Sequence, residues 1–156
     1  MNYTFTDYEE AVLAALAELK SPEGYLLTLE GFAGQLGLDP ETQHLEFFGR
    51  YPAVLVEVEG AEYEPESWPY WRETVTLNFL VVAKSYRSQD TARVGEAGAY
   101  AILADLRRLL VGNTLDLEVM ETGMEPVSVS RLQADQNMVI YEAKYRLVNP
   151  RMAKEG

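Results

Sequence analysis

The sequence has no cysteine and a single histidine, His44, among its 156 residues. Disulfide bonds, thiol nucleophiles and thiolate metal sites are therefore excluded, and so is a metal site built from several histidines. No apolar stretch approaches the length that a membrane-spanning helix requires. The first residues, MNYTFTDYEEA, are acidic and polar and do not resemble a signal peptide. We expect a protein that is made in the cytoplasm and does not enter a membrane.

Basic residues are also scarce, since 13 lysines and arginines stand against 25 aspartates and glutamates, giving a net charge of −12. Domains that bind nucleic acid usually carry a basic patch, and anionic membranes attract basic segments. Both classes of partner are therefore disfavoured. The hydrophobic fraction of 47% is ordinary for a globular protein, and the length suits one domain over residues 1–156.

The stretch EAGAYAILADLRRLLVGNTL, residues 96–115, predicts a long amphipathic helix. Its apolar residues recur at three- and four-residue spacing and so fall on one stripe. Arg107 and Arg108 suit the carboxyl end of a helix, and Gly112 is a typical stop signal. A second helix is predicted over residues 7–19, with Thr6 and Glu9 at the spacing of a capping box.

Alternating apolar and polar residues predict the strands, at residues 25–30, 53–59, 72–87, 125–133 and 138–148. Leu80 and Val82 break this alternation, which indicates that their end of the strand is covered on both faces. The remaining segments are predicted as a long loop or an irregular turn over 37–51, an acidic and aromatic hairpin loop over 61–70, a short strand or irregular stretch over 115–123, a turn over 135–137 and a frayed tail from 150.

This order of elements, α-β-β-β-α-β-β, predicts an α+β fold. Short links between strands favour a mostly antiparallel sheet. We therefore expect a two-layer sandwich in which both helices pack on one face of the sheet.

The sequence offers weak support for chemistry. His44 has no GxSxG nucleophile turn to accompany it, so a solvated loop residue is the simpler interpretation. A run of carboxylates could bind a hard cation or supply an acid and base pair, but its spacing matches no calcium loop; its members are Glu57, Glu59, Glu62, Glu64 and Glu66. No phosphate-binding glycine motif is present. We expect no enzyme activity, no metal and no cofactor.

Two groups of residues are candidates for contact with other proteins. The first is the acidic and aromatic segment, with Glu62, Tyr63, Glu64, Trp68, Tyr70 and Trp71. The simpler interpretation is that Tyr70 and Trp71 anchor the base of a hairpin in the core; the alternative is a protein-contact element, because Trp and Tyr are favoured interface anchors. The second group is on the outer face of the last strand and consists of Glu142, Lys144 and Arg146. These charged side chains either contact a neighbouring protein or are simply solvated.

Four stretches together resemble a known family: EEAVLAALAEL, PAVLVEVEG, GAYAILADLRRLLVG and VIYEAKYRLV. Their order and spacing over about Thr6 to Val148 are similar to the small tail proteins of Mu-like prophages, which are related in fold to phage tail terminators. The resemblance implies a structural protein that forms a hexameric ring, caps the tail tube and joins it to the head. Its implied partners are its own copies, the tail tube protein and the head–tail connector proteins, and its implied locations are the host cytoplasm and the virion tail.

Two other functions are compatible with the residues. One is a monomeric module that binds a peptide or a carbohydrate through the acidic and aromatic loop, residues 61–71. The other is a metal-dependent hydrolase built on the carboxylates between Glu57 and Glu66.

Overall fold

The computed structural model describes residues 1–84, 98–135 and 138–153 and is an α+β fold built on a five-stranded sheet with the strand order β1-β4-β5-β7-β6. The strands are β1 (Thr28–Gly31), β4 (Ala53–Pro65), β5 (Tyr70–Lys84), β6 (Glu125–Ala134) and β7 (Met138–Ala153). β1 runs parallel to β4, and all other neighbours are antiparallel. The predicted fold class is confirmed.

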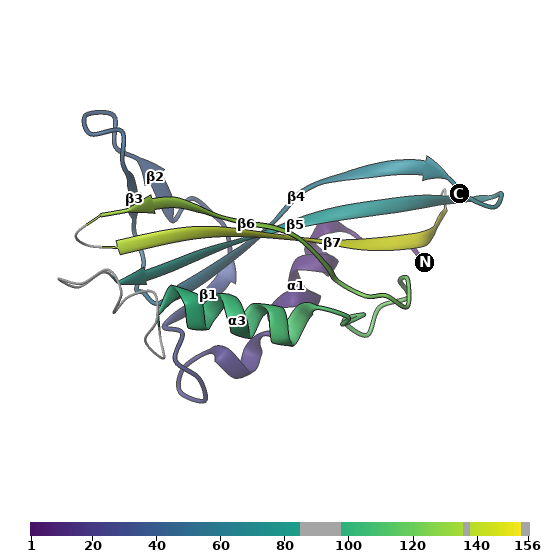
Figure 1. Cartoon of the computed structure of the whole chain (residues 1–156). Helices are drawn as coiled ribbons and strands as arrows, with labels where there is room; N and C mark the ends of the chain where they lie inside the picture. Colours follow the sequence, from purple (N-terminus) through teal and green to yellow (C-terminus); the bar gives the residue numbers. More distant parts are fainter. Residues whose placement is uncertain (85–97, 136–137, 154–156) are drawn as a thin grey trace.

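Both long helices, α1 (Phe5–Ala15) and α3 (Ala99–Leu110), lie on the same face of the sheet, as Figure 1 shows. A short 3₁₀ helix, η1 (Ala17–Leu19), follows α1. The main core lies between the helices and the sheet and includes Tyr8, Val12, Ile102, Leu106, Leu110, Val56, Leu77 and Phe79. Neither helix among the described residues is long and apolar enough to cross a membrane.

The start of α1 differs from the prediction. Thr4 is the N-cap: its hydroxyl accepts a hydrogen bond from the Asp7 amide at 3.1 Å, and the Asp7 carboxylate accepts one from the Thr4 amide at 2.7 Å. The predicted pair of Thr6 and Glu9 is wrong because Glu9 is used elsewhere. Its carboxylate accepts a hydrogen bond from the Val58 amide at 3.2 Å, next to the point where the β4–β5 register shifts. Glu9 thus joins the helix to the sheet.

The helix α3 confirms the periodicity seen in the sequence, and its stop signal lies where expected. Ala99, Ile102, Leu106 and Leu110 are buried, and Gly112 follows with φ of 78°. That left-handed conformation is easy for glycine and costly for other residues. The predicted helix was longer, over 96–115; residues 96–97 lie outside the described residues, and 111–115 are not helical.

The opposite face of the sheet is partly covered by a second, two-stranded sheet formed by β2 (Leu36–Leu38) and β3 (Leu45–Phe47). The prediction of a long loop or an irregular turn over 37–51 is therefore wrong for 37–38 and 45–47, which form strands. Side chains of this hairpin pack on an apolar patch of the main sheet made by Ala53, Val82, Met138 and Ile140. The expectation that the sheet is covered on both faces near Val82 is confirmed.

Three strands extend further than the sequence indicated. β4 continues to Pro65 and β5 begins at Tyr70, so the predicted loop over 61–70 is mostly paired strand with a tight tip. β7 runs to Ala153 and pairs with Trp71 and Tyr70, so the predicted fraying from residue 150 is wrong for 150–153. No strand forms over 115–123, which agrees with the irregular alternative. Asp135 of the predicted turn is hydrogen-bonded to Met138, whereas 136–137 lie outside the described residues.

The first residues of the chain are fastened to the end of β7, which lies close to the N-terminus in Figure 1. The Asn2 side chain exchanges two hydrogen bonds with the Ala153 backbone, at 2.6 and 2.8 Å. The buried side chain of Asn149 donates to the Met1 carbonyl at 2.7 Å. These bonds hold the outer end of β7 in addition to its pairing with β5.

Candidate functional site

The outer part of the β4–β5 hairpin extends past the helices, as Figure 1 shows. We call residues 61–71 the hairpin arm. Cross-strand pairing gives the arm two different faces. Tyr63 lies opposite Glu73 and Pro65 opposite Trp71, whereas Glu64 lies opposite Arg72 on the other face. The arm is therefore aromatic on the face that continues the helix-covered side of the sheet and mainly acidic on the other.

The predicted contact residues of the arm are all exposed: Glu62, Tyr63, Glu64, Trp68, Tyr70 and Trp71. Trp68, at the tip, is 92% exposed, and Trp71 is 42% exposed. The interpretation that Tyr70 and Trp71 anchor the hairpin in the core is wrong, because the strands continue beyond the core before the chain turns. A nearly fully exposed tryptophan supplies a large apolar surface for contact with another molecule.

A buried carboxylate, Glu73, lies at the base of the arm. It is only 4% exposed and accepts hydrogen bonds from the Tyr8 hydroxyl at 2.6 Å and from the Tyr63 hydroxyl at 2.9 Å. Burial, followed by the hydrogen bond to Glu73, raises the pKa of Tyr8 well above its ordinary value. The hydrogen bond to Glu73 is the main cause that raises the pKa of Tyr63. This cluster joins α1 to the arm and restrains the arm's orientation.

Sequence reasoning missed Glu73, although a signal was present. Glu73 shares the alternating positions of Val75, Leu77 and Phe79 along β5, and these three side chains are fully buried. A carboxylate at a core-facing position needs hydrogen-bond donors, which the two tyrosines provide.

The second predicted group, Glu142, Lys144 and Arg146, lies on the sheet face opposite the helices and forms ion pairs within the chain. The Lys144 ammonium contacts Glu59 at 2.7 Å and Glu142 at 3.7 Å, and Arg146 contacts Glu125 at 2.8 Å. The hydrogen bond to Glu59 is the main cause that raises the pKa of Lys144. These charges are thus partnered already, and the structure does not join them to the arm in one site.

Among these ion pairs lies Asn78, which is 5% exposed. Its amide nitrogen donates to Glu142 at 3.0 Å, while its buried Oδ1 has no hydrogen-bond partner among the described residues. Such an orphaned acceptor costs stability.

The run of glutamates does not form a metal site. Glu59 is bound to Lys144 and Glu66 to Arg72 at 2.7 Å, and among the described residues no group of three or more potential ligands is close enough to hold an ion. His44 is exposed in the link between β2 and β3. A hydrolase built on Glu57–Glu66 therefore has no support from the geometry.

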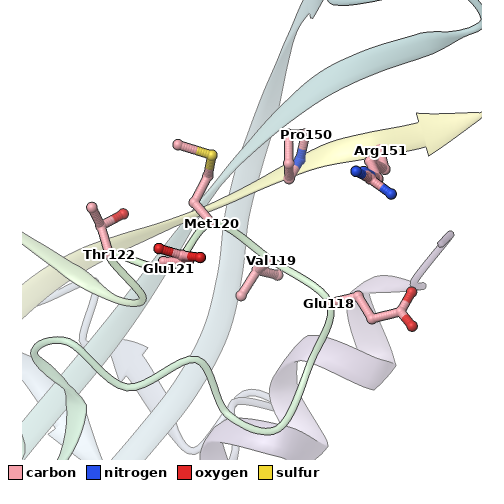
Figure 2. Close-up of a pocket in the computed structure, with 7 residues that line it drawn as sticks. All are labelled: Glu118, Val119, Met120, Glu121, Thr122, Pro150 and Arg151. Carbon is pink, nitrogen blue, oxygen red and sulfur yellow. The ribbon is translucent and has the colours of Figure 1, made fainter.

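A hollow of about 640 Å³ lies between the loop 118–122 and the outer part of β7. Figure 2 shows the residues that line it. Pro150 and Arg151 form one side, and Glu118 to Thr122 form the other. The loop is fixed to its surroundings, because the Met120 amide donates to the Val148 carbonyl at 2.9 Å and the Glu118 amide to the Tyr3 hydroxyl at 2.7 Å. The hollow brings together no set of catalytic groups.

A second hollow, of about 600 Å³, lies between α3 and β6. We call it the α3–β6 groove. It is lined by Tyr100, Leu103, Ala104 and Arg107 from α3, by Pro126, Val127, Ser128 and Val129 from β6, and by Lys144 and Tyr145 from β7. Val127 and Val129 are about half exposed, at 49% and 55%. Because β6 pairs only with β7 among the described strands, its outer edge is open.

An open, long edge strand with exposed valines is unusual for a protein that acts alone, since such edges invite pairing with other chains. The outer edge of β6 is therefore a candidate site for contact with another chain. Over residues 4–148, the sequence matches the family model described as Bacteriophage Mu, Gp37. The chain belongs to the bacteriophage Mu Gp37 family.

This membership covers nearly the whole chain, so the predicted resemblance to a Mu-like phage protein is confirmed. The Gp37 family indicates a structural, tail-related phage protein and is not a known enzyme family. A search of curated proteins gives no match.

Proposed function

We propose that this Gp37-family chain is a tail terminator or tail-completion protein, which forms a hexameric ring that caps the tail tube and joins it to the head. The family match over residues 4–148 carries this proposal. The partners are further copies of the chain, the tail tube protein and the head–tail connector proteins. The protein acts in the host cytoplasm during assembly and then in the virion tail.

Two surface features support assembly into a ring. The hairpin arm and the open β6 edge are unlike each other, so a contact between copies that uses both is heterologous, and repetition of such a contact around an axis closes a ring. The net charge of −12 suits a passage through which DNA moves without adhering to the wall.

The test has two parts. Light scattering over a concentration series measures the mass in solution, and a hexamer gives about 106 kDa, six times the 17.6 kDa of one chain. Electron microscopy then follows the chain mixed with tubes of the tail tube protein, where we expect a ring at one end of each tube. A chain that stays monomeric and leaves the tube ends unchanged contradicts the proposal.

A second candidate function is favoured by one observation, the 92% exposure of Trp68. A monomeric module could bind a peptide or carbohydrate through this side chain. That function predicts a monomer at every concentration and loss of ligand binding in Trp68→Ala. A hexamer whose ring survives Trp68→Ala and which binds no glycan or peptide in array screens excludes it.

A further inference from the structure

The α3–β6 groove arises because α3 has a second apolar stripe besides the one that faces the core. Tyr100, Leu103, Ala104 and Arg107 are spaced at i, i+3, i+4 and i+7, so they lie along one side of the helix. The ring of Tyr100 is 47% exposed and contacts Tyr141 with ring centroids 6.1 Å apart. The groove therefore offers an apolar floor that the chain's own described elements leave open.

Two arginines flank this apolar floor. Arg107 lines the groove from α3, and Arg131 lies on β6 opposite Tyr141, whose ring touches Tyr100 at the other end of the groove. Both arginines are exposed, and neither takes part in an ion pair within the described part of the chain. The nearby Arg108, by contrast, is paired with Glu18 and Asp105.

The hairpin arm has the complementary composition. Glu62 and Glu64 are exposed and belong to none of the ion pairs found in the described ranges, whereas Glu66 is paired with Arg72. Trp68 projects from the tip and Trp71 from the aromatic face. The arm thus presents unpaired carboxylates on one face and exposed aromatic rings on the other face and at the tip, and the groove presents unpaired guanidinium groups beside an apolar floor.

The arm cannot reach the groove of its own chain. β6 pairs with residues 139–146 of β7, whereas the arm pairs with the far end of that strand at Met152 and Ala153. Figure 1 shows the arm and β6 toward opposite ends of the sheet. A second copy of the chain, however, can supply an arm that matches the groove in charge and in aromatic content.

We infer that the hairpin arm of one copy lies in the α3–β6 groove of the next copy. This inference rests on the proposed function and identifies the contact between neighbouring copies that closes the ring. Trp68, at the tip of the arm, covers the valines of β6, and Glu62 and Glu64, on the acidic face, lie near Arg107 and Arg131. The arm supplies about half of the 20 to 30 residues that each side of a standard interface contains, so one contact is weak and closure of the ring strengthens it.

Charge reversal tests this contact. The arm variant Glu62→Arg/Glu64→Arg and the groove variant Arg107→Glu/Arg131→Glu each place like charges across the interface. We expect each variant alone to self-associate about a hundredfold more weakly than the wild type, because like charges at an interface are strongly unfavourable. Mixing the two variants pairs opposite charges at every contact, so the mass of the wild-type assembly returns in the mixture.

Matched controls change the same number of charges elsewhere. Glu23→Arg/Glu41→Arg and Lys20→Glu/Arg50→Glu alter exposed residues outside the arm and the groove. Both controls assemble like the wild type. If the arm and groove variants also assemble normally, or if their mixture fails to restore assembly, the inference is wrong.

Cross-linking provides a readout that does not depend on a stable ring. Because the chain contains no cysteine, Ser67→Cys at the arm tip and Ser128→Cys in the groove each introduce a unique thiol. A short bis-maleimide cross-linker should join these two variants several-fold more efficiently than it joins Ser67→Cys to the control Glu41→Cys. Equal yields overturn the inference.

The two assays separate this inference from the proposed function. A hexamer that shows neither charge rescue nor preferential cross-linking leaves the ring standing and refutes the arm-in-groove contact. Preferential cross-linking and rescue in an assembly that is only a dimer leave the contact standing and refute the ring.

Discussion

The two hydrogen bonds to the buried Glu73 predict that the Tyr8 hydroxyl stabilises the fold more than the Tyr63 hydroxyl does. The Tyr8 hydroxyl donates to Glu73 at 2.6 Å and belongs to a fully buried side chain, whereas Tyr63 donates at 2.9 Å and is 49% exposed. A buried hydrogen bond to a charged group contributes about 1.5–3 kcal/mol, and water can replace a lost partner only at an exposed site. We expect Tyr8→Phe to lower the free energy of unfolding by about 2 kcal/mol and Tyr63→Phe by about 0.5–1 kcal/mol.

Urea denaturation followed by circular dichroism measures both values, and thermal denaturation should show Tm lowered by about 4–8 °C in Tyr8→Phe. A double-mutant cycle with Glu73→Gln then isolates the Tyr8–Glu73 interaction from other effects of the lost hydroxyl. A loss in Tyr8→Phe no larger than in Tyr63→Phe, or a coupling energy near zero, refutes the assignment of Glu73 as the acceptor that fixes α1 to the arm.

Three further predictions concern pH, the helix cap and a turn. Because folding raises the pKa of Tyr8 above 10.0, the stabilising effect of its hydroxyl is complete below pH 10 and is lost at higher pH. Above pH 10, the free energy of unfolding should fall less steeply with pH in Tyr8→Phe than in the wild type, by up to about 1.4 kcal/mol per pH unit. Thr4→Ala should cost about 1 kcal/mol in urea denaturation and Thr6→Ala much less, whereas equal costs contradict the observed cap. Gly123→Ala should cost about 1–3 kcal/mol in the same assay, because Gly123 has φ of 63° and an added Cβ would lie 2.6 Å from the Gly112 backbone; an unchanged midpoint contradicts this.

Periodic patterns in the sequence predicted the parts of the fold that face the core. The stripe of α3 and the alternation in β4, β5 and β7 repeat over many residues, so single exceptions do not obscure them. Capping is different, because it depends on two residues. Thr4 with Asp7 and Thr6 with Glu9 have the same spacing, and the sequence does not show that Glu9 is required by the Val58 amide.

Tertiary contacts determine the elements that the sequence did not predict. The β2–β3 hairpin is short and has no clear alternation, and it forms where the apolar patch around Val82 and Ile140 needs a cover. The arm contains Pro65 but remains a strand, because proline is tolerated at an edge, where its missing amide leaves no bond unmade.

The candidate surfaces were predictable in part. The sequence shows that residues 61–71 are rich in aromatic and acidic residues, and this composition identified the arm as a candidate contact surface. The groove was not, because Tyr100 and Val129 are far apart in the sequence and come together only when β6 pairs with β7 beside α3. The helix α3 packs against the core with one stripe of residues and lines the groove with another, and the sequence periodicity identified only the stripe that faces the core.

The position of β7 has a consequence for synthesis on the ribosome. β7 follows every other described element in chain order, yet it lies between β5 and β6 inside the sheet. Until residues 138–153 emerge, the nascent chain holds β5 with an unpaired apolar edge and β6 without any neighbour. The five-stranded sheet is therefore completed only after residues 138–153 have emerged, and until then the open edge of β5 can pair wrongly with other chains.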